Sequence, residues 1–164
     1  MNTKYVNKKE NDGYSKLNKF NQSEGIWDEL TGNLKYGTRH DVVGVRNSHT
    51  YLIELKDREQ YSSVTSFPFP TVYIEPTKLA YLYQTTVDDN DIANCYFINF
   101  FGNDIAIWNI KKLDIDQLKL RKNIKIYDKG LGQTIVADRY LLPLTDATIY
   151  KYDKDSDGYY KQNG

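Results

Sequence analysis

Two carboxylates and a lysine, Asp41, Glu54 and Lys56, have the residue types needed for metal-assisted hydrolysis of a phosphodiester bond. Carboxylates held side by side bind a hard cation such as Mg²⁺, which prefers oxygen ligands and keeps several waters. The bound cation lowers the pKa of its water and stabilises charge in phosphoryl displacement. A lysine beside it can orient the attacking water or offset the developing charge. This chemistry requires the three side chains to meet in one place.

The segment around these residues predicts a β-hairpin that would bring them together. Residues 39–46 and 49–57 are rich in Val, Ile, Leu and Tyr, and Asn47-Ser48 between them suits a tight turn. With that turn, Asp41 faces Glu54, and facing residues of an antiparallel pair point to the same side of the sheet. Alternation along the strand places Lys56 on that side too. Facing carboxylates repel each other, and a cation between them removes the conflict.

The structural alternative is that these charges belong to solvated strand ends. A Glu-x-Lys triplet is short enough to occur by chance in 164 residues. The context favours the functional interpretation, because the triplet lies in an apolar strand, Asp41 lies in the adjoining strand, and the register matches.

With this arrangement the chain resembles the PD-(D/E)xK nucleases, whose fold is also called restriction-endonuclease-like. The matching residues are Asp41, twelve intervening positions, then Glu54-Leu55-Lys56, and His40 stands where the motif has proline. Residues 70–82, PTVYIEPTKLAYL, resemble the stretch that follows the catalytic strand in phage-type members. Residues 96–101 and 140–144 resemble later strands, so the resemblance covers about residues 15–150.

The resemblance implies an α/β fold with a restriction-endonuclease-like core, a mixed central β-sheet flanked by helices. It implies that Asp41, Glu54 and the Leu55 carbonyl bind Mg²⁺ or Mn²⁺, while Lys56 acts on the water. Many members carry a further acid on the first helix. Glu24 fits this position, with a solvent-exposed carboxylate as the alternative.

Two residues after the hairpin are candidate substrate-binding groups. Glu75 is expected either to face the same cleft or to support the helix that follows it. Lys78, one turn into that helix, is expected to contact a substrate phosphate.

The remaining elements follow from periodicity and turn residues. A helix is predicted over residues 13–31, where Leu17, Phe20, Glu24, Trp27 and Thr31 share a face. Pro76 is expected to open a second helix. Asp114 is expected to cap a short helix carrying Leu118. The other predicted strands cover residues 71–75, 95–101, 105–110 and 134–142.

The domain organisation expected is a flexible N-terminus over residues 1–12, a single nuclease-like domain over residues 13–150, and a polar C-terminal tail over residues 151–164. The length of 164 residues fits one compact domain.

Composition narrows the location and the partners. No run approaches the ~20 apolar residues of a transmembrane helix, and the lysine-rich start lacks the apolar region of a secretory signal. One cysteine, Cys95, excludes a disulfide within the chain, which suits a cytoplasmic location. Heavy use of Tyr, Asn, Lys and Ile is typical of AT-rich phage or mobile-element genes in a bacterial host.

Net charge does not identify a nucleic-acid binder, since 22 basic and 22 acidic residues balance. Two stretches are locally basic, residues 4–19 and residues 111–129. Each is read as a solvated surface or as a nucleic-acid contact. Trp108 and the fifteen tyrosines are expected in the core more often than on base-stacking surfaces.

The sequence therefore predicts a metal-dependent endonuclease that hydrolyses DNA, with RNA as the other substrate considered. The alternative from a different class is a nuclease-fold or other α/β module that binds a protein or nucleic-acid partner and catalyses nothing. No separate specificity domain is visible. Selective cutting would then need a homodimer, a protein partner or recognition of DNA structure.

Overall fold

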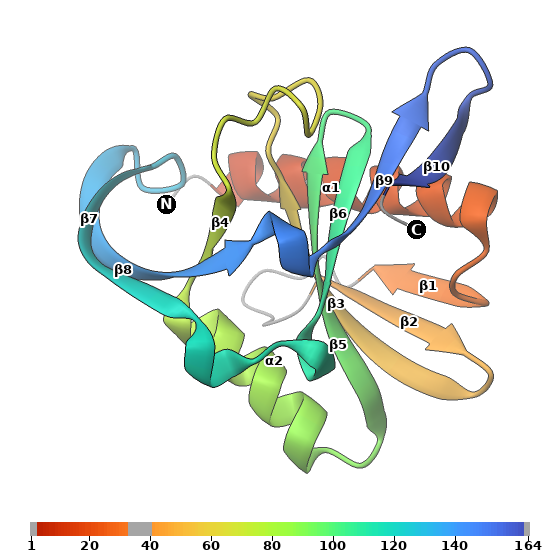
Figure 1. The fold of residues 1–164 in the computed structure, drawn as a ribbon, viewed down its shortest axis with the longest axis horizontal. Coiled ribbons are helices and arrows are strands. Elements are labelled where there is room, and N and C mark those ends of the chain that lie inside the picture. Colours follow the sequence, from red (N-terminus) through yellow and green to blue (C-terminus); the bar gives the residue numbers. More distant parts are fainter. Residues whose placement is uncertain (1–2, 33–40, 163–164) are drawn as a thin grey trace.

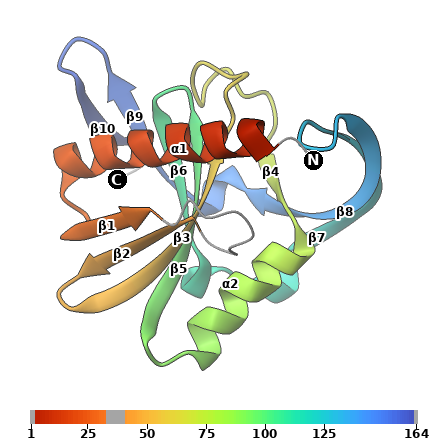
Figure 2. The ribbon, with the colours of Figure 1, turned by 180° about the vertical axis from the view of Figure 1, so that it is seen from behind.

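The computed structural model describes the backbone of residues 3–32 and 41–162, and the side chains from residue 12 onward within those ranges. A central mixed sheet carries helix α1 (Thr3–Glu24) on one face and helix α2 (Pro76–Asp88) with a smaller sheet on the other (Figures 1 and 2). The expected α/β class, with a mixed sheet flanked by helices, is confirmed. Neither described helix is long and apolar enough to cross a membrane.

The central sheet has seven strands. In spatial order they are β1 (Glu29–Gly32), β2 (Val42–Arg46), β3 (His49–Asp57), β5 (Ile92–Phe101), β6 (Asp104–Asn109), β9 (Thr148–Asp153) and β10 (Gly158–Gln162). β3 and β5 run parallel, with α2 in the connection between them, and the other neighbouring pairs are antiparallel. The smaller sheet is antiparallel, in the order β4 (Thr71–Ile74), β8 (Gln133–Pro143), β7 (Lys119–Asp128).

Alternation along β3 divides the core between the two faces of the central sheet. Ile53 points to the α1 face, where it packs with Leu17 and Phe20 of the helix. Its neighbour Leu52 points to the other face, where it packs with Leu79 and Leu82 of α2. Glu54 has the same parity as Leu52, so its carboxylate lies on the α2 face of the sheet.

The predicted hairpin of β2 and β3 is confirmed in its turn and its register. Asn47 and Ser48 both have positive φ, 50° and 65°, as a two-residue type I′ turn requires. Arg46 pairs with His49, and the pairing continues to Val42 opposite Ile53. Residues 39–40, including His40, lie outside the described residues.

Three further predictions are confirmed. A strand over Thr71–Ile74 leads into α2, which begins at Pro76, where a missing backbone N–H costs nothing. β5 and β6 form the predicted pair around Gly102, whose φ of 60° favours glycine. The last predicted strand is β8, one residue longer at each end than expected.

The first helix differs from its prediction at both ends. It begins at Thr3, within the segment expected to be flexible, and ends at Glu24. Gly25 has a φ of 61° and closes the helix by donating to the Asn21 carbonyl at 2.7 Å. The Asn21 side chain then bonds both backbone groups of Trp27, which turns the chain into β1. The apolar spacing up to Thr31 therefore came from a helix followed by a strand.

Two other expectations were wrong. The polar segment after residue 150 is not a tail, because β10 pairs with β9, which itself pairs with β6 (Figure 1). Asp114 opens only one 3-10 turn, Ile115–Gln117, and makes no side-chain cap. The basic segment after it is strand β7, which the sequence analysis missed. None of its side chains is fully buried, so its charged residues interrupt the apolar alternation that predicts a strand.

Close packing of Trp27 on β2 makes Gly44 sensitive to substitution. A Cβ at Gly44 would lie 2.7 Å from Trp27 Cδ1, and Trp27 is only 5% exposed. We expect Gly44→Ala to destabilise the protein by about 1–3 kcal/mol through overpacking. Urea unfolding measures this. Gly158→Ala, whose Cβ meets Ser156 Oγ at an ordinary 3.5 Å, is the control. Equal midpoints for the two variants would contradict the expected effect.

Candidate active site

A cavity of about 540 Å³ lies at the C-terminal end of β3. Gly13 of α1, the start of α2, and the β7–β8 hairpin border it. Its ionisable lining residues are Asp41, Glu54, Lys56, Asp57, Arg58, Glu75, Lys78, Asp128, Lys129 and Arg139. Six of the seven sequence-predicted site residues line it, and the exception is Glu24.

β3 carries both the acidic residue Glu54 and the basic residue Lys56 of this cavity. Glu54 is buried, with 4% of its surface exposed, whereas Lys56 is exposed. Both have the same parity along the strand, and the intervening Leu55 also borders the cavity. The triplet therefore runs from a buried carboxylate to an ammonium group at the surface.

Asp41 lies one residue before β2 and forms hydrogen bonds with the backbone of both residues that flank Glu54, Ile53 and Leu55. Its backbone N–H donates to the Ile53 carbonyl at 3.0 Å. Its carboxylate oxygen Oδ2 accepts a hydrogen bond from the Leu55 backbone N–H at 2.8 Å. These two bonds fix the carboxylate beside Glu54, as the hairpin register predicted.

Lys78 is an ion-pair partner of Glu54, joined through the Glu54 Oε1 atom. Burial, followed by the negative charges of Asp41 and Glu75, raises the pKa of Glu54 to about 8, although Lys78 acts in the opposite direction. Burial alone would lower the pKa of Lys78, but the carboxylates of Glu54, Glu75 and Asp41 more than offset it and raise that pKa. The ionised form of Glu54 is therefore disfavoured, chiefly because this side chain is buried, even with Lys78 beside it.

Glu75 lines the cavity, as one of its two sequence interpretations required. It is also the N-terminal boundary residue of α2 but makes no side-chain cap hydrogen bond there. Its carboxylate is half exposed and lies 4.0 Å from the Arg139 guanidinium of β8.

Arg58 is a cavity residue that the sequence analysis did not identify. Its Nε donates to Asn99 Oδ1 at 2.7 Å and its NH2 group donates to the Tyr73 carbonyl at 3.3 Å. Within the described ranges it forms no ion pair with a carboxylate, and burial lowers its pKa to about 10. A guanidinium held by neutral groups keeps a positive charge for an anion that enters the cavity. The repeating parity of residues 54, 56 and 58 was the signal available in the sequence.

Glu24 does not belong to the cavity. It is exposed at the C-terminal end of α1, and its negative charge acts on Tyr150 of β9, whose pKa is raised first by burial and then by Glu24. The cavity borders the other part of α1, at Gly13. The predicted helix began ten residues later than α1 does, so Glu24 was expected within the helix, whereas it is the last residue of α1 and lies away from the cavity.

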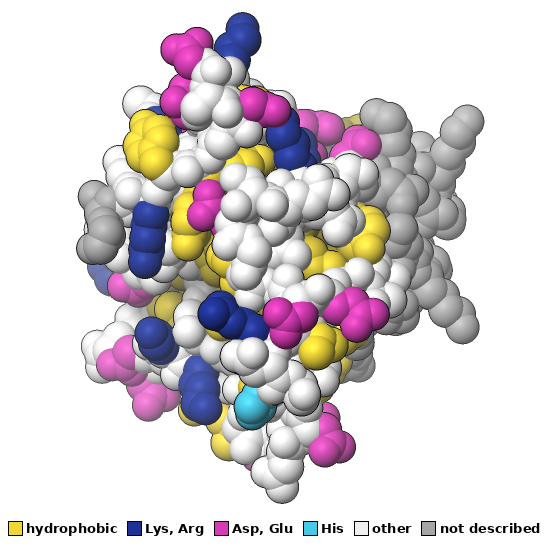
Figure 3. All heavy atoms as spheres, turned by 90° about the vertical axis from the view of Figure 1, so that its right-hand side faces the viewer, with side chains coloured by type: hydrophobic (Ala, Val, Ile, Leu, Met, Phe, Trp, Pro, Cys, Tyr) yellow, Lys and Arg dark blue, Asp and Glu magenta, His cyan; other side chains and the backbone are white. Residues whose placement is uncertain are grey.

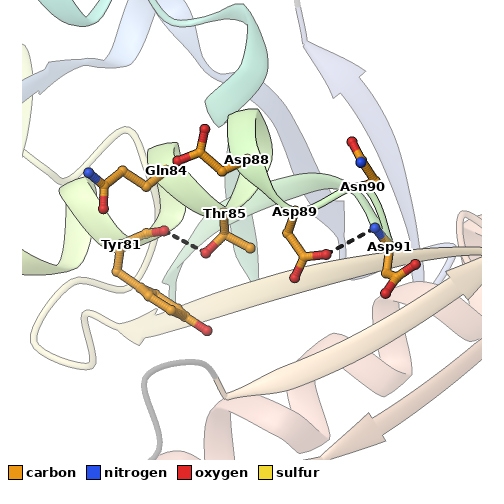
Figure 4. A pocket seen from close by; sticks show the side chains of 7 residues that line it. All are labelled: Tyr81, Gln84, Thr85, Asp88, Asp89, Asn90 and Asp91. Carbon is orange, nitrogen blue, oxygen red and sulfur yellow. Dashed lines mark hydrogen bonds between the residues drawn. The ribbon is translucent and has the colours of Figure 1, made fainter.

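A second hollow lies at the C-terminal end of α2 (Figure 4). Three aspartates, Asp88, Asp89 and Asp91, line it, but the Asp89 carboxylate accepts from the Asp91 backbone N–H at 2.9 Å and so stabilises the turn into β5. Figure 4 shows the carboxylates of Asp88 and Asp91 pointing away from each other. This hollow has no basic side chain in its lining.

The donor set of the first cavity fits a hard divalent cation. Among the described residues no group of three or more His, Cys, Asp or Glu side chains is arranged to hold a metal. Mg²⁺ typically takes only one or two carboxylates, and its remaining ligands are waters and substrate oxygens. Asp41 and Glu54 supply such a pair of carboxylates, and the Leu55 backbone lies beside them, since its N–H donates to Asp41. The raised pKa of Glu54 shows that its ionised form is disfavoured, and a nearby cation would stabilise that form.

A hollow with two adjacent carboxylates, an exposed lysine and an arginine without an acidic partner can bind a cation and a phosphate together. Neither a family model nor a curated protein matches this chain, so its fold and this cavity carry the functional argument.

Proposed function

We propose that this protein is a divalent-metal-dependent endonuclease that hydrolyses phosphodiester bonds in DNA. The observation that carries the proposal is the meeting of Asp41, Glu54 and Lys56 in one cavity. The mixed sheet with helices on its faces supports the restriction-endonuclease-like core that the resemblance implies.

Asp41, Glu54 and the Leu55 carbonyl would hold Mg²⁺ or Mn²⁺. The cation supplies an activated water and positive charge for the phosphoryl group when it is bound. The protein contributes a carboxylate pair fixed before the cation arrives. Asp41 is held by the Leu55 backbone N–H, and Glu54 is held by the strand on which it lies. Fixed ligands of this kind need no reorganisation during the reaction.

The basic side chains of the cavity have separate tasks in this proposal. Lys56, exposed beside the carboxylates, orients the attacking water and offsets charge on the phosphate. Lys78, the ion-pair partner of Glu54, would contact an oxygen of a phosphate bound over the carboxylates. Arg58 binds a non-bridging phosphate oxygen with the N–H groups that Asn99 and Tyr73 leave unused.

The mixed charge of the cavity favours a phosphodiester over an uncharged substrate. Five carboxylates and five basic side chains line it. Carboxylates alone would repel a negatively charged substrate, and basic side chains alone would bind a phosphate without activating water. The combination suits a reaction in which both a metal ion and a phosphate are bound.

Metal-dependent cleavage is the direct test. We expect the purified protein to cut circular single-stranded DNA or supercoiled plasmid in Mn²⁺ or Mg²⁺ and to leave both intact in chelator. Gel electrophoresis follows the products, and an RNA of equal length separates a DNA enzyme from an RNA enzyme. Intact DNA under all metal conditions, from a protein with a cooperative thermal melt, would favour the alternative of a module that binds a partner without catalysis.

A further inference from the structure

The β7–β8 hairpin forms one wall of the cavity and extends beyond it. It bends away from the central sheet, and its tip lies beside the N-terminal end of α1 in both ribbon views (Figures 1 and 2). Residues 126–130, Ile135 and Arg139 of this hairpin line the cavity. A ligand bound over Glu54 in this cavity therefore lies beside the hairpin.

Tyr127 is an aromatic side chain at the rim of the cavity. It lines the cavity, yet 61% of its surface is exposed, which is far more than a packing role requires. Its cross-strand partner is Thr134, and no ring of the described residues contacts it. An exposed aromatic face beside a reactive centre is the feature on which nucleic-acid bases stack.

Basic side chains extend from this tyrosine along the same strand. Lys119, Lys122 and Lys125 of β7 are exposed and form no ion pair with any described residue. Lys125 has the same parity as Tyr127, and its cross-strand partner is the uncharged Val136. The opposite side of the molecule, with β1, β9 and β10, shows acidic and basic side chains interspersed (Figure 3). A row of unpaired cations suits a phosphate backbone.

The depth of the cavity decides between paired and unpaired strands. Glu54 is 4% exposed at the base, and the space above it is about 540 Å³, the size of a pocket for one small ligand. In a duplex the base faces are covered by their stacked neighbours, so a rim aromatic cannot stack on them. An unpaired strand can place one phosphate over the carboxylates and turn its base onto the rim.

We propose that the β7–β8 hairpin is an arm for unpaired DNA, in which Tyr127 stacks on a base next to the cleaved phosphate and Lys122 and Lys125 hold phosphates further along the strand. The preferred substrate is then single-stranded DNA or an unpaired segment within a duplex. Strand preference in cleavage rests on the proposed nuclease function, whereas binding by the arm does not.

Binding without cleavage tests the arm by itself. We expect fluorescence anisotropy in chelator to show that a labelled 20-nucleotide single strand binds at least about tenfold more tightly than the same sequence as a duplex. Tyr127→Ala should weaken single-strand binding by about tenfold, the scale of one lost base stack, and Tyr127→Phe should restore it. Tyr160→Ala is the matched control, because Tyr160 is 56% exposed on β10 and does not line the cavity.

The outcomes separate the arm from the nuclease. Equal affinity for single strand and duplex, or unchanged binding by Tyr127→Ala, would overturn the arm even if the protein cuts DNA. Tighter binding of an RNA single strand than of DNA would overturn the DNA assignment. Selective single-strand binding that depends on Tyr127 supports the arm, and it does so whether or not cleavage is found.

Discussion

Glu54→Ala is expected to lower the rate of DNA cleavage in Mn²⁺ by at least about a hundredfold to a thousandfold, the scale seen when one preorganised electrostatic group is removed. The variant removes one of the two carboxylates that would bind the cation, and Asp41 alone cannot replace it. Initial rates on single-stranded circular DNA give the size of the loss. Lys56→Ala should show a comparable loss without a change in metal binding.

Glu24→Ala is the matched control for that experiment. It removes a carboxylate of the same type from the exposed end of α1, outside the cavity, so its rate should equal that of the wild type. Wild-type cleavage by Glu54→Ala, with a normal thermal melt, would refute the assignment of this cavity as the active site.

Glu54→Gln is expected to raise the melting temperature of the metal-free protein at alkaline pH. The pKa of Glu54 is raised by burial to about 8 in the folded state, from an ordinary value near 4.5. Between these values the folded state binds a proton that the unfolded state releases. The stabilising contribution of Glu54 is therefore complete below pH 4.5, declines as pH rises, and is lost above pH 8. Glutamine keeps the shape without this titration.

Thermal melts in chelator from pH 5 to pH 9 measure this difference. The gap between Glu54→Gln and wild type should be small at pH 5 and should reach several degrees at pH 9, since a shift of several pKa units corresponds to several kcal/mol. Glu29→Gln, an exposed residue of β1, should show no such trend. If the melting temperatures of wild type and Glu54→Gln differ by the same amount at every pH in this range, ionisation of Glu54 does not destabilise the folded state.

The hairpin that builds the site could be predicted because its information is local. Asn47-Ser48 adopts the positive φ values of the turn, and a two-residue turn fixes every pairing that follows. Once the register was known, Asp41 and Glu54 had to lie near each other. Pro76 marked the start of α2 in the same way, through a constraint within the residue itself.

The errors arose where the sequence pattern was ambiguous. Spacing of three and four residues continued past Gly25, so a helix and the strand after it looked like one helix. The polar segments at β7 and β10 lack the apolar alternation of a buried strand. They form strands because β9 and β8 each present an edge with which they pair. This pairing uses backbone hydrogen bonds, which do not depend on the type of side chain.

The sequence by itself determined the class of the fold, the β2–β3 hairpin, and the adjacency of Asp41 with Glu54 and Lys56, because these follow from turn chemistry and from period-two alternation. Only the tertiary structure decided what surrounds them. Arg58, directly after β3, and Tyr127 of β7 both line the cavity, and Glu24 is excluded from it by the direction of α1. Contacts between elements distant in the chain depend on how their apolar faces pack, and a local pattern does not contain that arrangement.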